Sequence, residues 1–149
     1  MKNHRRRTRT FVAALVGLMM PLPTMAGSPI GVWLTRAGDA RIHVSRCGAG
    51  ICGSVVWLKE PIDPNTGKPQ VDDNNIDPKL RKRPIIGLRI LSMPKPTGPE
   101  SWSGTIYNAD DGKTYQGTVA LQESTALEVR GCLSIFCGSE TWTKADGHR

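Results

Sequence analysis

From residue 31 onward the chain is a succession of short segments in which apolar and polar residues alternate, and this period of two constrains the fold most. In residues 41–46, for example, Ile42 and Val44 alternate with polar residues, as in a strand with one buried face. Comparable segments, separated by turns, occupy residues 31–35, 41–46, 51–58, 88–92, 101–107, 114–121, 126–130 and 139–144. We therefore predict an all-β fold of about eight antiparallel strands. A sandwich is the alternative, but sequential hairpins favour an up-and-down barrel, because closure leaves no exposed strand edges.

The strand pattern lapses over residues 59–87. Prolines exclude a regular hydrogen-bonded ladder there, at Pro61, Pro64, Pro69, Pro78 and Pro84. A segment of this length is expected to carry local structure of its own. Asp77 followed by Pro78 is typical of an N-cap and the first position of a helix. We predict a long loop between the third and fourth strands that contains one short helix ending before Pro84.

The first 26 residues have the three parts of a secretory signal peptide. Five basic residues precede a short apolar run from Phe11 to Met20, and Thr24-Met25-Ala26 provides a small-x-small cleavage site. The apolar run is too short to span a bilayer, which disfavours an uncleaved anchor. We expect export by the Sec route to the periplasm or beyond, and one mature domain, residues 27–149, without a transmembrane span. That domain keeps fifteen basic and thirteen acidic side chains, a balance that does not favour nucleic-acid binding.

The four cysteines form two pairs of equal spacing, Cys47 with Cys52 and Cys132 with Cys137. An even number of cysteines in an exported chain favours disulfides over a four-thiolate zinc site. Residues that flank a short turn on antiparallel strands can reach the Cα separation that a disulfide requires, about 4.4–6.8 Å. We therefore expect each pair to bridge its own hairpin. Two bridges between the hairpins remain the alternative, since four cysteines allow three connectivities.

A set of short motifs occurs along the chain in one order: Gly31-Val32-Trp33, Cys52-Gly53, Val56-Trp57-Leu58, Pro84-Ile85-Ile86-Gly87-Leu88, Trp102-Ser103-Gly104, Ile106-Tyr107, Asp111-Gly112-Lys113-Thr114-Tyr115, Val129-Arg130-Gly131-Cys132 and Thr141-Trp142-Thr143. Together they resemble DUF2147, a family of exported bacterial proteins of unknown function. The resemblance spans roughly residues 31–144 and implies a lipocalin-like fold rather than an activity. The chain departs from the family at Lys144, where arginine is common. Lysine can still lie over an aromatic ring but lacks the planar stacking of a guanidinium.

Trp33 and Lys144 belong to the first and last predicted strands, which are neighbours in a closed barrel. We expect Trp33 to close one end of the barrel beneath the Lys144 ammonium, as the lipocalin resemblance also implies. This role is structural. The alternative, in which Trp33 lines a ligand site, is less favoured because buried aromatic side chains mostly pack.

Three further rings, Trp102, Tyr107 and Tyr115, lie on two strands that also carry Gly104 and Gly117. Rings offer apolar contact area and a polar tip, and glycines in a barrel wall can leave space beside them. We therefore expect these rings to bind a small apolar or amphipathic molecule inside the barrel. The alternative is a barrel filled by the same rings, in which case the protein is a structural or interaction protein of the cell envelope, and residues 59–87 bind its partner.

Catalytic chemistry has little support in the sequence. His43 is the one histidine between the signal segment and His148, and no serine has a nucleophile-elbow context. The acidic residues between Asp63 and Asp77 offer oxygen ligands for calcium but do not match the EF-hand spacing. We expect no enzyme activity, no cofactor and no metal site.

Overall fold

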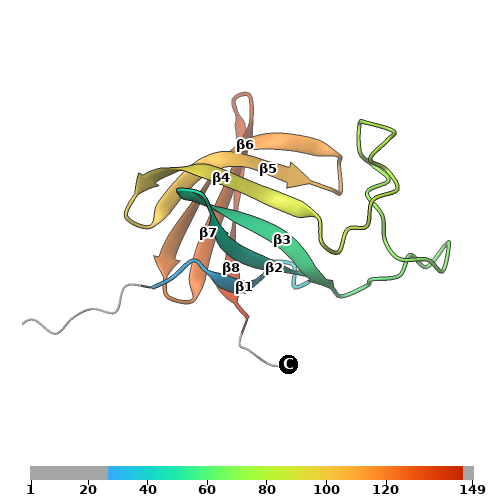
Figure 1. The fold of residues 1–149 in the computed structure, drawn as a ribbon, viewed down its shortest axis with the longest axis horizontal. Helices are drawn as coiled ribbons and strands as arrows, with labels where there is room; N and C mark the ends of the chain where they lie inside the picture. Colours follow the sequence, from blue (N-terminus) through green and yellow to red (C-terminus); the bar gives the residue numbers. More distant parts are fainter. Residues whose placement is uncertain (1–26, 146–149) are drawn as a thin grey trace, which may run out of the picture.

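The computed structural model describes residues 27–145, which form a barrel of eight antiparallel strands (Figure 1). The strands are β1 (Gly31–Leu34), β2 (Ala40–Cys47), β3 (Gly50–Leu58), β4 (Arg89–Gly98), β5 (Ser101–Asn108), β6 (Lys113–Glu123), β7 (Ala126–Leu133) and β8 (Phe136–Lys144). Each strand pairs with the next along the chain, and β1 also pairs with β8. The predicted up-and-down barrel is therefore confirmed. The predicted signal segment, residues 1–26, lies outside the described residues. Residues 27–145 include no helix long and apolar enough to cross a membrane.

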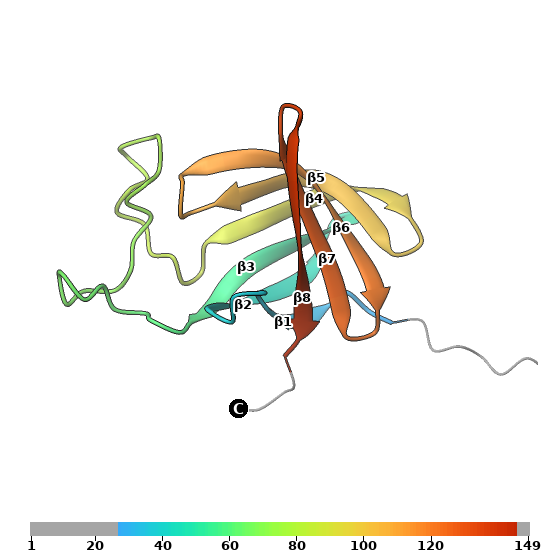
Figure 2. The ribbon, with the colours of Figure 1, turned by 180° about the vertical axis from the view of Figure 1, so that it is seen from behind.

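The two ends of the barrel differ. At the closed end the β2–β3, β4–β5 and β6–β7 turns are short, whereas the opposite, open end carries the β3–β4 loop and the β7–β8 hairpin tip. Figures 1 and 2 show the loop reaching out from one side of the barrel and the hairpin rising above it. The β3–β4 loop is thus the one long connection between strands in the described residues, and it lies at the open end.

Strand alternation fills the closed half of the barrel with apolar side chains. In β2, Ile42 and Val44 are buried, and His43 between them is exposed on the outer face. The complete buried cluster consists of Trp33, Ile42, Val44, Ile51, Val55, Leu91, Met93, Trp102, Val119, Leu121, Leu127, Val129 and Trp142. This cluster is the hydrophobic core.

Both disulfides are local. Cys47 and Cys52 join β2 to β3 across their turn, with Cα atoms 5.8 Å apart. Cys132 and Cys137 lie directly opposite each other in the β7–β8 hairpin, with Cα atoms 4.0 Å apart. The predicted local pairing is confirmed, and bridges between the hairpins and a zinc site are excluded because all four cysteines are used.

The fourth strand is longer than predicted. The sequence predicts a strand over residues 88–92, but β4 continues through Pro94 and Pro96 to Gly98. Its pairing with β5 shifts register between Ser92 and Lys95 and again after Pro96. Such irregularities accommodate proline, because the missing N–H then falls outside the regular ladder.

The short helix predicted in the β3–β4 loop does not form. The chain makes two consecutive turns, in which the Leu80 N–H bonds the Asp77 carbonyl and the Arg83 N–H bonds the Leu80 carbonyl, at 3.0 and 3.1 Å. The Asp77 side chain does accept the Lys79 N–H, as an N-cap would. The Arg83 carbonyl, however, accepts the backbone N–H of Asp72 at 3.0 Å. The segment therefore consists of two separate turns, and its last carbonyl is used to pair with the preceding part of the loop.

Candidate ligand cavity

A cavity of about 1030 Å³ occupies the open half of the barrel. It is bordered by the β1–β2 turn, the β3–β4 loop and the β5–β6 turn, and its floor is the hydrophobic core. Its larger apolar side chains are Ile42, Val55, Leu58, Val71, Ile85, Ile90, Ile106, Val129 and Trp142. Polar and charged residues gather at the rim, among them Arg36, Asp39, Lys59, Glu60, Asp73 and Asp110. The cavity is therefore apolar inside and polar at its mouth.

One carboxylate lies within the apolar wall. Glu140 stands two residues before Trp142 on β8, so strand alternation turns both side chains inward, and both line the cavity. The Trp142 indole N–H donates a hydrogen bond to Glu140. Opposite Glu140 on β7 is Val129, and within residues 27–145 the structure gives the carboxylate no ion-pair partner. Glu140 can therefore accept further hydrogen bonds from a molecule in the cavity.

A buried polar network fastens the β3–β4 loop to the end of β5. The Asp72 side chain is fully buried, and its Oδ1 accepts the Tyr107 hydroxyl at 2.6 Å. Its Oδ2 accepts Nη2 of Arg83 at 2.7 Å and Nδ2 of Asn75 at 2.8 Å. Asn75 Nδ2 also donates to the Tyr107 hydroxyl at 2.7 Å, and the Arg83 guanidinium lies 5.2 Å from the Tyr107 ring centroid. Because every member is bonded to another, the network holds the loop at the cavity rim.

Both tyrosines near the mouth donate their hydroxyl protons to carboxylates. Burial, together with the hydrogen bond to Asp72, raises the pKa of Tyr107 above its ordinary value. The hydrogen bond from the Tyr115 hydroxyl to Asp111 is the main cause of the raised pKa of Tyr115. In both cases ionisation of the phenol would place two negative charges side by side.

The structure separates the three rings predicted to bind a ligand. Trp102 is 7% exposed and belongs to the core at the closed end. Tyr115 pairs with Ile106, and both line the cavity. Tyr107 follows Ile106 on β5, so its side chain turns to the other face and joins the loop network at the rim. Tyr115 and Tyr107 therefore both border the cavity, Tyr115 from the wall and Tyr107 at the rim, whereas Trp102 does not.

Gly104 and Gly117 do not leave space beside these rings, contrary to the prediction. A side chain at Gly104 would overlap the backbone oxygen of Ser92 on β4, and one at Gly117 would overlap Ile106. These glycines allow close approach of neighbouring strands. The hollow half of the barrel lies elsewhere, next to Gly138, where an added Cβ would meet nothing within 4 Å.

Trp33 and Lys144 lie at the junction of the first and last strands. They are directly paired residues of β1 and β8, and the Lys144 Nζ lies 4.6 Å from the Trp33 ring centroid. The Trp33 side chain is fully buried, and its indole N–H donates to the Pro29 carbonyl at 2.7 Å. Lys144 Nζ donates to the carbonyls of Ser28 and Ile30, both at 2.9 Å. These contacts attach the segment before β1 to the barrel.

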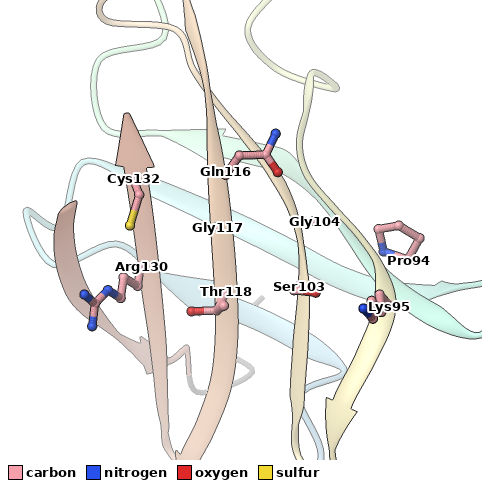
Figure 3. Close-up of a pocket in the computed structure, with 9 residues that line it drawn as sticks. All are labelled: Pro94, Lys95, Ser103, Gly104, Gln116, Gly117, Thr118, Arg130 and Cys132. Carbon is pink, nitrogen blue, oxygen red and sulfur yellow. The ribbon is translucent and has the colours of Figure 1, made fainter. Parts of the chain in front are cut away.

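A second depression, of about 400 Å³, lies on the outside of the wall formed by β4 to β7 (Figure 3). Its polar side chains stand at outward positions, where Lys95 pairs with Ser103 and Thr118 pairs with Arg130. Figure 3 shows Lys95 and Arg130 on opposite sides of the depression. Since the charged groups do not converge on one point, the inner cavity is the better candidate site.

The acidic residues considered for calcium are used locally. Asp63 accepts the Asn65 N–H at 2.8 Å and the Thr66 hydroxyl at 3.0 Å, and the backbone bond from Asn65 is the main cause of its lowered pKa. Asp72 is buried against Arg83. Within residues 27–145 no group of three or more His, Cys, Asp or Glu side chains is placed to hold a metal ion.

Sequence reasoning missed Glu140 and the Asp72 network. The inward position of Glu140 could have been predicted, because Glu140 lies two residues before Trp142 in the alternating pattern of the last strand and so shares its face. The contact of Asp72 with Tyr107 could not have been predicted, since Tyr107 lies 35 residues further along the chain. A contact of that separation has no local pattern.

Comparisons with known proteins agree with this architecture. The model of one family, described as an uncharacterised protein conserved in bacteria (DUF2147), matches residues 31–144. Among solved structures, the chain is similar to the protein HP1028 from the human pathogen Helicobacter pylori, which is described as belonging to the lipocalin family. The TM-score is 0.66 at 22% identity, over 82% of this chain and 86% of the other. At that identity the likeness concerns the fold. A comparison with curated proteins finds no match. The chain, matched over nearly all of its barrel, belongs to the DUF2147 family.

Proposed function

We propose that this protein binds one small amphipathic molecule in the open half of the barrel. The observation that carries the proposal is the cavity of about 1030 Å³, whose inner wall is apolar and contains one inward carboxylate, Glu140. Ligand pockets for small molecules commonly measure about 300–1,000 Å³. An apolar ligand body would pack against the wall, and a polar end would reach the charged rim.

The position of Glu140 favours ligands that carry a hydrogen-bond donor. A carboxylate surrounded by apolar side chains accepts hydrogen bonds strongly, and it attracts a cation. It repels another carboxylate by the same electrostatic rule. We therefore propose that long-chain alcohols and amines bind more tightly than fatty acids of equal length.

The two disulfides support a location in an oxidising compartment, since such bonds persist outside the cytoplasm. We propose the periplasm, reached by cleavage of the predicted signal segment. The protein would then be a periplasmic binder or carrier.

Titration of the purified mature protein with an alkylamine, an alcohol and a fatty acid of equal chain length tests the proposal, with tryptophan emission as the readout. Gly138→Phe places a ring in the open space of the cavity and should weaken binding of all three at least tenfold. Thr141→Phe, on the exposed outer face of the same strand, is the matched control and should bind normally. Equal affinity in both variants would show that the ligand binds elsewhere.

Glu140→Gln tests the chemistry of the site separately. Glutamine can still accept the Trp142 indole N–H, so the fold should be preserved. The variant should lose affinity for the amine and gain affinity for the fatty acid. If no ligand of any class binds the unmodified protein, the alternative holds, namely an envelope interaction protein that does not use its cavity.

A further inference from the structure

The tip of the β7–β8 hairpin exposes three apolar side chains. β7 ends at Leu133, which pairs with Phe136 at the start of β8, and Ile135 lies in the turn between them. Ile135 is 84% exposed, Phe136 78% and Leu133 45%. In Figures 1 and 2 this hairpin rises above the rest of the barrel. Adjacent exposed apolar side chains of this size are typical of an interaction surface.

The tip is braced. The disulfide between Cys132 and Cys137 joins the two strands directly below Leu133 and Phe136. The apolar side chains are therefore presented on a covalently closed hairpin, where little conformational entropy is lost when they enter another phase. A narrow projection of this kind fits a soft surface better than a flat protein face.

A second projection combines apolar and basic residues. In the β3–β4 loop, Ile76 is 78% and Leu80 39% exposed, and the exposed Lys79, Arg81 and Lys82 lie beside them. Within residues 27–145 the one salt bridge joins Arg83 to Asp72, so Lys79, Arg81 and Lys82 have no ion-pair partner there, although Arg81 Nε donates to the Asn75 carbonyl at 2.7 Å. The exposed Asp73 and Asp77 precede this cluster in the loop. Figures 1 and 2 show the yellow-green part of this loop rising toward the same side of the molecule as the hairpin tip.

We propose that the open end of the barrel docks on an anionic lipid surface. The hairpin tip would enter the boundary between headgroups and acyl chains, and the exposed cations of residues 79–82 would contact lipid phosphates. Apolar side chains next to lysine and arginine are the composition of interfacial membrane-binding segments. The same end holds the cavity mouth, but docking does not require a ligand in the cavity and goes beyond the function proposed above.

Vesicle flotation with the disulfide-bonded mature protein tests this inference. Vesicles of phosphatidylcholine alone are compared with vesicles that contain one third phosphatidylglycerol. We expect binding to the anionic vesicles that weakens as salt is raised, because exposed charges are screened. Substitution of Ile135 and Phe136 by serine should reduce binding at least tenfold, since each buried apolar side chain contributes about one power of ten.

Val56→Ser is the matched control, because Val56 is 45% exposed on the outer wall of β3, away from the tip. Its binding should be unchanged. Ile135→Glu provides a second tip variant at the most exposed position, and near-ultraviolet circular dichroism checks that each variant is folded. Replacement of Lys79 and Lys82 by glutamate should abolish the preference for anionic vesicles.

Three outcomes would overturn the proposal. The first is no flotation with either vesicle, and the second is flotation that the tip variants leave unchanged. The third is a dimer in light scattering, without vesicles, that the tip variants dissociate, because a second copy of the chain would then cover the tip. Ligand titration without vesicles is measured in parallel, so failure of docking is distinguishable from failure of cavity binding.

Discussion

Replacement of Tyr107 by phenylalanine removes one hydroxyl from the contact between the β3–β4 loop and the barrel and leaves the ring in place. The hydroxyl donates to the buried Oδ1 of Asp72 at 2.6 Å and accepts Nδ2 of Asn75 at 2.7 Å. Asp72 Oδ2 keeps Arg83 and Asn75, and the Arg83 guanidinium keeps the ring beneath it. The variant therefore isolates the hydrogen bonds of the hydroxyl.

The expected cost comes mainly from Oδ1 of Asp72. This oxygen belongs to a fully buried carboxylate and has the Tyr107 hydroxyl as its one hydrogen-bond partner within the described residues. A hydrogen bond to a charged group contributes about 1.5–3 kcal/mol, and a buried acceptor left without a donor costs a similar amount. We expect Tyr107→Phe to lower the free energy of unfolding by about 2–3 kcal/mol if the loop unfolds together with the barrel.

Urea denaturation followed by tryptophan emission measures this change, and hydrogen exchange at the amides of Asp72 and Asn75 measures local opening. Both amides bond within the loop, to the carbonyls of Arg83 and Asp72. If the loop opens separately, exchange at these amides accelerates while the urea midpoint stays constant. The reasoning is refuted if neither the midpoint nor the exchange rates change.

Three further predictions concern stability. Trp33→Ala should lower the free energy of unfolding, measured by urea denaturation, by about 3–5 kcal/mol, because it truncates a fully buried tryptophan. Lys144→Ala should lower it by about 0.5–2 kcal/mol, the range of a cation–π contact. Equal losses in the two variants would contradict the structural role of Trp33. Replacement of both Cys47 and Cys52 by serine should lower the free energy of unfolding by about 2 kcal/mol, as the chain-entropy relation gives for so short a loop. Replacement of Cys132 and Cys137 should have the same effect. A double variant as stable as the unmodified protein would contradict this prediction. Because the pKa of Tyr107 is raised by folding, its contribution is fully present below about pH 10 and is lost as pH rises through the folded-state pKa. Tyr107→Phe should therefore flatten the alkaline loss of stability, and an unchanged slope would count against the Asp72 contact.

The alternation of apolar and polar residues predicted the strands because each strand faces the core on one side and solvent on the other. The prediction was weaker wherever a contact with another segment decided the outcome. The sequence predicts a strand over residues 88–92, yet register shifts against β5 accommodate Pro94 and Pro96 and let β4 continue to Gly98. The sequence predicts a helix from Asp77, yet residues 77–83 form two turns, and Arg83 at their end pairs with Asp72 through both its carbonyl and its guanidinium.

For the candidate site, too, the sequence predicted some residues correctly and missed others. Tyr107 and Tyr115 were predicted near the ligand and both border the cavity, although the Tyr107 hydroxyl is used by the loop network. Trp102 lies in the core instead. All three rings lie on the neighbouring strands β5 and β6. Strand register decides how deep in the barrel each ring lies and whether it faces inward or outward. Glu140 is inward for the same reason, and its importance becomes visible only when the cavity around it is known.

By itself the sequence determined that this chain forms short antiparallel strands with a long loop between the third and fourth, and it favoured a barrel with local disulfides, because periodicity and cysteine spacing are local properties. The tertiary structure alone decided which half of the barrel is hollow, which side chains line it and how the loop is attached. Those properties depend on contacts between residues far apart in the chain, such as Asp72 and Tyr107, for which no local pattern exists. They also depend on how closely neighbouring strands approach, as at Gly104 and Gly117.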